Sequence, residues 1–532
     1  MRSPTASKVM LLGFDAAAPG LLEEGMADGW LPSLARLRKR GAYGRLRSTS
    51  DWLVSSHWAS FYLGVPPGEH GCYHFLQWRA DEMALRRPDP AWMIREPFWR
   101  QMAADGLRVV ALDVPYTHAP RSQDTVELSG WATNELTFSP YASPARLKDD
   151  VHRIFGGSLR GTDRGLAFEK YAPRPLAELL RMRDGLVEIL GRSSRLALEL
   201  AEREPWDVFL AVFGAPHRAG HLLWSGSSVQ GEAGPDVDAV LHEALRDVYV
   251  ATDRAIGELV EAAGADTHVL VFGLIGMAHN TSRTDILPVM LARILAGEAK
   301  AEPAHEKLRL AKRLRRAIPL EWRHAVKTHL PLSIQDRLST FWRSGRVDWT
   351  RTRAVSLTGD VHGYIRINLR GREAQGIVEP GCDFEDLCDE IAEGLMGFVD
   401  SVTGEPVVAE VMRTDEIYPN GSRVEALPDL IVRWAPSPCA HTGEVVSHRF
   451  GRIPWPTPGK NPNGRSGNHT GEGFVVAAGA GIRPGSSLDP RSHILDLAPT
   501  AYALLGRTKP PYMTGKPLPE LVAGTESPGR TG

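Results

Sequence analysis

The sequence predicts an α/β protein built on a doubly wound, mostly parallel sheet flanked by helices. Short, continuous apolar runs recur along the chain, which is typical of parallel strands that are covered on both faces. The runs follow stretches with helical spacing, and this alternation predicts repeated β–α units. At 532 residues the chain is also long enough to bury a large sheet and to carry inserted elements.

The first expected strand covers residues 9–14, and a turn and a helix follow it. The helix is expected over residues 31–37, with a cationic C-terminal end and Gly41 as its stop. Further core strands are expected at residues 107–112, 208–213, 268–272 and 473–479, and a strand pattern returns over residues 352–369. Ligands bind at the carboxyl ends of the strands in such sheets, so the polar residues after each strand are the first candidates for a site.

A basic stretch interrupts this pattern and predicts an inserted helical segment over residues 291–348. It divides the expected core into a first part, residues 1–290, and a second part, residues 349–522. The Gly-, Ser- and Pro-containing tail, residues 523–532, is expected to fray. Two interpretations of the insertion stay open: a solvated cover on the sheet, or an element that attracts anions or a membrane surface.

Composition excludes several classes of protein. Hydrophobic residues at 42%, charged residues at 24% and a net charge of -2 give no sign of disorder or of a nucleic-acid partner. The four cysteines are scattered, which favours reduced thiols and a cytoplasmic location. The N-terminal apolar run is short and is interpreted as a strand, and no run of about 18 apolar residues predicts a membrane span. The oligomeric state is not indicated.

Two histidines follow the expected strand at residues 208–213. His217 and His221 are four residues apart, so on a helix both imidazoles lie on one face, within reach of a single ion. His469 lies in a loop rich in Gly and Asn that could bring it over the same strand ends, and Asp15 follows the first strand. A histidine taken alone is usually an ordinary surface or core residue, so the prediction of a metal site depends on the spacing of the pair.

Several motifs occur in the order that is typical of one family. They are Gly13-Phe14-Asp15, the helix around Leu31-Pro32-Ser33-Leu34, the segment from Ser60 to Gly71, Gly467-Asn468-His469, Leu497 to Thr500, and Met513 to Leu518. This ordered set resembles the type I phosphodiesterase and nucleotide pyrophosphatase branch of the alkaline phosphatase superfamily. The resemblance spans nearly the whole chain and implies an alkaline-phosphatase-like fold.

The resemblance also implies a mechanism in which two zinc-like ions activate a Thr or Ser nucleophile and stabilise the transferring group. One ion takes an Asp, a following His and a late His; these places fall on His217, His221 and His469, with His in place of Asp at the first. Three His ligands still form a competent zinc site with an open position.

The second ion of the family takes the Asp after the first strand, the nucleophile and an adjacent Asp-His pair. Asp15 is retained, but the pair falls on Leu274 and Ile275, which cannot bind a cation. The nucleophile position falls on Val54, so that a shift of one residue would bring Ser55 into it, with Ser56 and His57 beside it.

Other residues could compensate. Asp360 and His362 stand two apart at a turn into a strand, where they serve either as second-site ligands or as turn and core hydrogen-bonding groups. Arg366 is either a fixed cation for an anionic substrate or an ordinary solvated arginine.

The preferred hypothesis is a metal-dependent hydrolase or transferase of phosphate or sulfate esters, acting on a small anionic ester. Zinc is the expected metal, with iron, manganese and copper left open. Ser55 and Asp15 are the candidate catalytic residues, and a water on the ion is an alternative nucleophile. The alternatives are an inactive protein that keeps the scaffold for binding or regulation, and a single-metal enzyme with non-hydrolytic chemistry.

Overall fold

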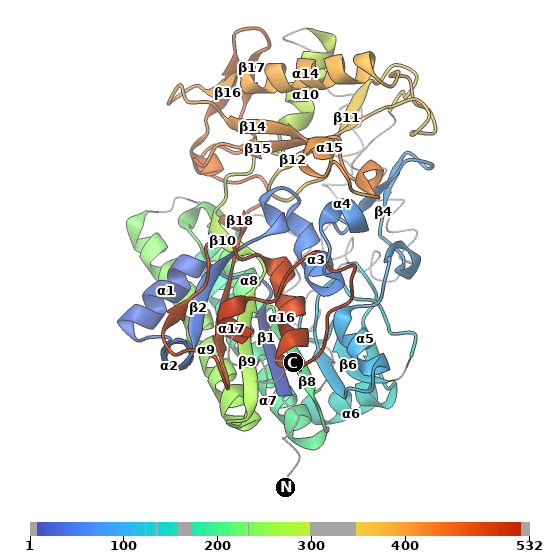
Figure 1. Ribbon diagram of the computed structural model, residues 1–532. Helices are drawn as coiled ribbons and strands as arrows, with labels where there is room; N and C mark the ends of the chain where they lie inside the picture. The colour runs from blue at the N-terminus through green and yellow to red at the C-terminus, as the bar shows by residue number, and fades with distance from the viewer. Residues whose placement is uncertain are drawn as a thin grey trace. The chain divides into compact units, whose positions relative to one another are not determined.

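A computed structural model of the chain describes residues 8–122, 124–133, 137–156, 173–231, 234–297 and 347–522 (Figure 1). These residues fall into two compact units. The first takes its residues from 1–70, 89–280 and 460–532, and the second takes its residues from 71–88 and 281–459.

A nine-stranded sheet forms the centre of the first unit, in the order β20-β2-β19-β9-β1-β8-β5-β6-β7. Its strands are β1 (Lys8–Phe14), β2 (Ala42–Arg47), β5 (Val109–Leu112), β6 (Thr125–Ser129), β7 (Tyr141–Ser143), β8 (Val208–Phe213), β9 (Thr267–Gly273), β19 (Glu472–Ala478) and β20 (Ser486–Ser487). The five strands from β9 to β6 are parallel to one another, whereas β19 runs antiparallel to both of its neighbours. The predicted α/β class with a mostly parallel sheet is thereby confirmed.

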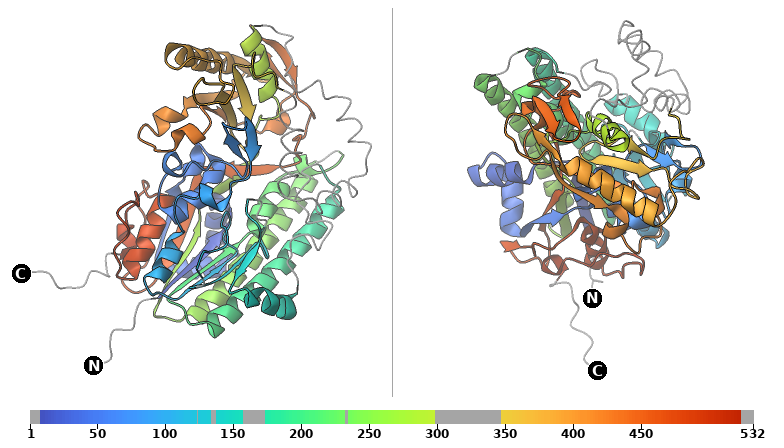
Figure 2. Two further views of the ribbon diagram at one scale, coloured as in Figure 1. Left: turned by 90° about the vertical axis from the view of Figure 1, so that its right-hand side faces the viewer. Right: turned by 90° about the horizontal axis from the view of Figure 1, so that it is seen from above.

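Each apolar run that predicted a core strand forms one. Strand β1 pairs with β8 and β9, and every residue of β8 and β9 is buried. Continuous apolar sequence suits this position because helices cover both faces of the sheet. The long helices α7 (Leu176–Arg203) and α9 (Pro235–Ala263) pack together on one face, and α16 (Leu497–Leu504) lies on the other (Figure 2).

The other helices of the first unit are α1 (Pro19–Asp28), α2 (Pro32–Arg40), α3 (His57–Leu63), α4 (Pro67–His70), α5 (Phe98–Ala104), α6 (Arg146–Phe155), α8 (Ala215–Leu222) and α17 (Pro519–Val522). Helix α2 has Pro in its first turn and three basic residues in its last turn, which suits the helix dipole. It stops at Gly41 as predicted. A side chain there would collide with the backbone carbonyl of Ala477 on β19, so only glycine allows this close approach.

The second unit holds a four-stranded antiparallel sheet in the order β11-β12-β15-β14, a three-stranded sheet β13-β16-β17 and a hairpin of β3 and β4. These strands are β3 (Gln77–Arg79), β4 (Ala84–Arg86), β11 (Ala354–Leu357), β12 (Gly363–Ile367), β13 (Phe398–Asp400), β14 (Val408–Arg413), β15 (Leu430–Trp434), β16 (Glu444–Ser447) and β17 (Gly451–Pro454). Helices α10 (Leu287–Ala296) and α14 (Cys382–Met396) contribute to its own hydrophobic core, and α15 (Thr414–Ile417) follows β14.

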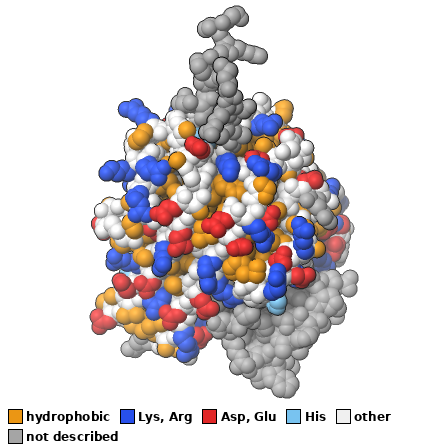
Figure 3. All heavy atoms as spheres, turned by 90° about the horizontal axis from the view of Figure 1, so that it is seen from below, with side chains coloured by type: hydrophobic (Ala, Val, Ile, Leu, Met, Phe, Trp, Pro, Cys, Tyr) orange, Lys and Arg blue, Asp and Glu red, His pale blue; other side chains and the backbone are white. Residues whose placement is uncertain are grey.

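Most of the expected basic insertion and the expected frayed tail lie outside the described residues. None of the described helices combines the length and the apolar character that a bilayer crossing requires. The face of the molecule seen in Figure 3 carries acidic and basic side chains that are interspersed, and no field of a single sign covers it.

Candidate metal centre

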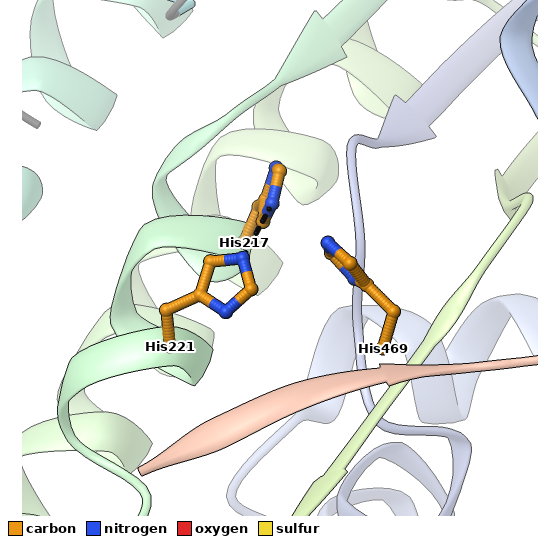
Figure 4. Close-up of side chains that lie close together, drawn as sticks. All are labelled: His217, His221 and His469. Carbon is orange, nitrogen blue, oxygen red and sulfur yellow. Dashed lines mark hydrogen bonds between the residues drawn. The ribbon is translucent and has the colours of Figure 1, made fainter. Parts of the chain in front are cut away.

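Three histidines converge at the carboxyl end of the central sheet. Strand β8 leads directly into α8, which carries His217 and His221 one turn apart, and His469 lies on β18 (Gly467–Thr470). Strand β18 pairs with β10 (Gly276–His279), in a register that sets Met277 opposite His469. The three ring centroids are 4.8, 4.8 and 4.7 Å apart, and the rings point toward one another (Figure 4).

Two of the rings have their proton positions fixed by acceptors. The Nδ1–H of His217 donates to Asp15 Oδ2 at 2.5 Å, and the Nδ1–H of His221 donates to the Gly467 carbonyl at 2.9 Å. A carboxylate and a carbonyl can only accept, so Nδ1 is the protonated nitrogen in both rings. In their neutral forms the two rings therefore present lone pairs at Nε2, and these two atoms lie 3.0 Å apart.

This geometry fits a metal ion. Among the described residues, these histidines form a group of possible metal ligands. One ring nitrogen from each of them lies within 4.8 Å of the other two. Two nitrogens that bind one tetrahedral zinc lie about 3.3 Å apart, close to the separation of the two Nε2 atoms. A hydrogen-bond acceptor on the other ring nitrogen is the usual partner of a metal-binding histidine.

Electrostatics favour the neutral, metal-binding form of His221. Burial holds the pKa of His221 well below its ordinary value, and the positive charge of Arg465 and the other two histidines lower it further. The effect of Arg465 on this pKa means that its positive charge lies near His221. A guanidinium near the cluster suits an anionic ligand.

Asp15 follows β1 and is engaged on both carboxylate oxygens. Besides the bond to His217, its Oδ1 accepts a hydrogen bond from Trp58 Nε1 at 2.9 Å. Burial alone would raise the pKa of Asp15, but the charge and hydrogen bond of His217 and the indole N–H outweigh it and hold the pKa at about 2. Asp15 is therefore a carboxylate in the folded protein at neutral pH.

The segment expected to hold a nucleophile forms two short 3₁₀ turns, Thr49–Asp51 and Val54–Ser56, before α3. Ser55 is partly exposed, whereas Ser56 is fully buried and donates to Thr49 Oγ1 at 2.8 Å. His57 starts α3, and its Nδ1–H donates to the Val54 carbonyl at 2.7 Å. Burial lowers the pKa of His57 to about 4, so this ring is neutral.

The expected second-ion position is apolar. Leu274 and Ile275 are fully buried, and Trp58 is 3% exposed and packs edge-on against Phe272. Sequence reasoning missed Trp58, because a tryptophan near a helix start has no local signal that it will meet Asp15. Only the packing of α3 against the strand ends brings the two side chains together.

The remaining candidate residues lie in the second unit. Asp360 and His362 belong to the bend before β12 rather than to the strand, and Asp360 Oδ2 lies 3.6 Å from His74 Nε2. Arg366 is 2% exposed, and its guanidinium binds Glu373 at 2.7 Å and the Leu427 carbonyl. Its hydrogen-bonding groups are thus turned to the interior of that unit.

Comparison with known protein families identifies the family of this chain. The sequence profile of the type I phosphodiesterase / nucleotide pyrophosphatase family matches residues 9–437. The chain belongs to this family. The matched range contains Asp15, His217 and His221, and it ends before His469. A comparison with curated protein sequences gives no match.

Two solved structures are similar to this chain over most of its length. Phosphonoacetate hydrolase from Sinorhizobium meliloti 1021, in complex with phosphonoformate, is 13% identical with a TM-score of 0.49, over 94% of this chain and 95% of that chain. Human ectonucleotide pyrophosphatase / phosphodiesterase 5 is 13% identical with a TM-score of 0.44, over 96% of this chain and 97% of that chain.

Proposed function

We propose that this member of the family hydrolyses phosphate or sulfate esters with a single metal ion held by His217, His221 and His469. One observation carries the proposal: two Nε2 lone pairs, each fixed by an acceptor on the opposite ring nitrogen, face each other at 3.0 Å, and a third imidazole lies beside them. Zinc is the metal that suits three imidazoles best, and iron, manganese and copper also accept them.

A bound ion of this kind supplies Lewis-acid stabilisation of negative charge and lowers the pKa of a water molecule. The side chains supply the rest. The charge of Arg465, which is felt at His221, attracts a small anionic ester to the cluster. The Ser55 hydroxyl, partly exposed beside the buried Ser56, donates a hydrogen bond to the substrate.

A second candidate function is supported by Leu274 and Ile275, which are fully buried where the family resemblance implied an Asp-His pair. In that case the chain keeps the scaffold as a binding or regulatory protein without catalysis. Metal content and turnover separate the two candidates, and the origin of the product oxygen separates hydrolysis from a non-hydrolytic single-metal reaction.

The first experiment measures the metal content of protein purified without added metal and then supplied with zinc. We expect about one equivalent in the wild type, and its loss in His217→Ala, His221→Ala and His469→Ala. His448→Ala is the matched control, because His448 is an exposed histidine in a turn of the second unit.

Turnover of phosphate and sulfate esters of p-nitrophenol is then measured on the same proteins. We expect the three variants to lose at least about a hundredfold in kcat/KM, since a catalytic ion contributes several kcal/mol. A wild type that binds no metal overturns the proposal. One equivalent without turnover of any ester favours the binding protein.

We also propose a cytoplasmic location, which the scattered positions of the four cysteines in the sequence support. Fractionation of the native host with an antibody against the chain tests it, and recovery in an oxidising compartment contradicts it.

A further inference from the structure

The Asp15 carboxylate has two oxygens and two donors. Its Oδ2 lies 2.5 Å from His217 Nδ1 and its Oδ1 lies 2.9 Å from Trp58 Nε1, and the side chain is 13% exposed. Both donors are N–H groups, so each oxygen already has a partner within the protein. A carboxylate held by two such donors can orient both of them.

Packing fixes the indole in this position. Trp58 stands edge-on to Phe61 and Phe272, with ring centroids 5.9 and 6.3 Å away. A Cβ atom at Gly13 would lie 3.1 Å from Phe272, 3.2 Å from Val212 and 3.4 Å from the Trp58 ring, so the glycine on β1 lets these side chains pack closely. The ring is therefore held by β1, β9 and α3 together, and its N–H points at the strand-end carboxylate.

The next residues along the strand ends contribute no competing polar group. Leu274 and Ile275 are fully buried, and the Ile275 carbonyl accepts from Ala17 N at 3.3 Å. An indole N–H supplies the hydrogen bond that a buried carboxylate requires, without the charge of an ion.

We infer that Asp15 is a positioning residue for the metal ligand His217, and that the Trp58 indole takes the side of Asp15 where a second cation would bind. The site then holds one metal ion, because the indole takes the place of the second. This inference rests on the proposed three-histidine metal site.

The chemical consequence is specific to Nε2 of His217. A carboxylate on Nδ1–H fixes the tautomer, fixes the ring orientation and increases the basicity of the opposite nitrogen. His221 receives the same orientation from a neutral carbonyl, that of Gly467, so the two ligands on α8 differ in donor strength. Loss of the Asp15 charge is thus expected to weaken metal binding without removing a ligand.

The test measures zinc affinity by chelator competition and the ligand set by X-ray absorption at the zinc edge. For Asp15→Asn we expect about 10- to 100-fold weaker zinc binding, about one equivalent at saturation, and an unchanged set of three imidazole ligands. His217→Ala is expected to change the ligand set itself.

Trp58→Phe keeps the aromatic packing and removes only the N–H. We expect zinc binding to weaken by about three- to tenfold relative to Trp206→Phe, because Asp15 loses its orienting donor. Trp206→Phe is the control: Trp206 is also buried in the first unit, and its N–H donates to the Ala201 carbonyl at 3.0 Å.

The outcomes separate the inference from the proposed function. If the wild type binds no zinc, the proposed function fails. If it binds one equivalent but Asp15→Asn loses an oxygen ligand from the absorption spectrum, Asp15 is a metal ligand and only the inference fails. Two equivalents in the wild type, or a Trp58→Phe protein that matches Trp206→Phe in affinity, also overturn the inference.

Discussion

His221 Nε2 lies 3.0 Å from His217 Nε2. In the neutral form of each ring the proton is on Nδ1, so both Nε2 atoms present a lone pair. Two lone pairs that face each other at this distance repel, so the pair is stable only when a proton or a cation lies between them. The arrangement ties the stability of α8 to the occupancy of the cluster.

Zinc is therefore expected to raise the thermal unfolding midpoint of the protein. At a free zinc concentration a hundredfold above Kd, binding to the native state adds about 2.7 kcal/mol to the free energy of unfolding. Calorimetry with and without zinc measures the shift. His448→Ala should respond like the wild type and His469→Ala should not; an equal shift in both proteins would place the bound zinc elsewhere.

Arg465→Met is expected to lower kcat/KM for anionic esters, mainly through KM. The guanidinium acts on His221 by its charge, and a charge pair worth about 2 kcal/mol corresponds to roughly a thirtyfold loss. Arg483→Met, which changes an exposed arginine of the same unit, is the control. Steady-state kinetics at low and high salt measure the effect. An equal loss of kcat/KM in Arg465→Met and Arg483→Met would contradict a local role for Arg465.

Ser55→Ala is expected to reduce turnover by about fivefold, the effect of one hydrogen bond to the substrate. A serine nucleophile would instead lose at least about a thousandfold on this change. Ser56→Ala is the neighbouring control, because its hydroxyl is buried and donates to Thr49. Acid quench during turnover and the stereochemistry at phosphorus are the direct measurements: inversion with no phosphoserine supports water as nucleophile, and a trapped phosphoserine rejects it.

Asp113 is expected to make stability depend on pH. Burial raises its pKa to about 6, against the backbone N–H groups of Trp131 and Ala132, which lower it. An unfolded carboxyl titrates near about 3.9, so between about pH 4 and pH 6 the native state holds a proton that the unfolded chain has released. The stabilisation that Asp113 contributes to the folded protein is fully present below about pH 4 and is lost as the pH rises through about 6.

Across that window the free energy of unfolding should fall by on the order of 2–3 kcal/mol through this one group. The amide of Asp113→Asn cannot titrate, so the free energy of unfolding of this variant should not fall across the window through position 113. Subtracting its pH profile from that of the wild type removes the contributions of the other titrating groups. Denaturant unfolding at several pH values measures both profiles. Parallel profiles would show that Asp113 titrates normally in the folded protein.

Much of the fold could be predicted from local pattern. The apolar runs that became β1, β8 and β9 are long enough, and buried enough on both faces, to carry their own signal. The partition into two units could not be predicted in this way, since residues 71–88 join residues 281–459 through contacts between segments far apart in the sequence.

The candidate site could also be predicted only in part. The spacing of His217 and His221 predicts a shared helix face, and the structure brings His469 to them. The partners of Asp15 and Arg366 could not be read from the sequence. Trp58 and Glu373 meet these side chains through packing within each unit, and nothing in the flanking residues encodes the meeting.

The bond from His221 to the Gly467 carbonyl has a consequence for the synthesis of the chain. The strand that carries the last imidazole also aims an earlier one, although the two bonded residues are 246 positions apart. A chain released before β18 would lack one ligand and leave a second misdirected. If the cluster binds the proposed ion, only a chain that has been synthesised and folded as far as β18 would hold it, and a shorter product would not.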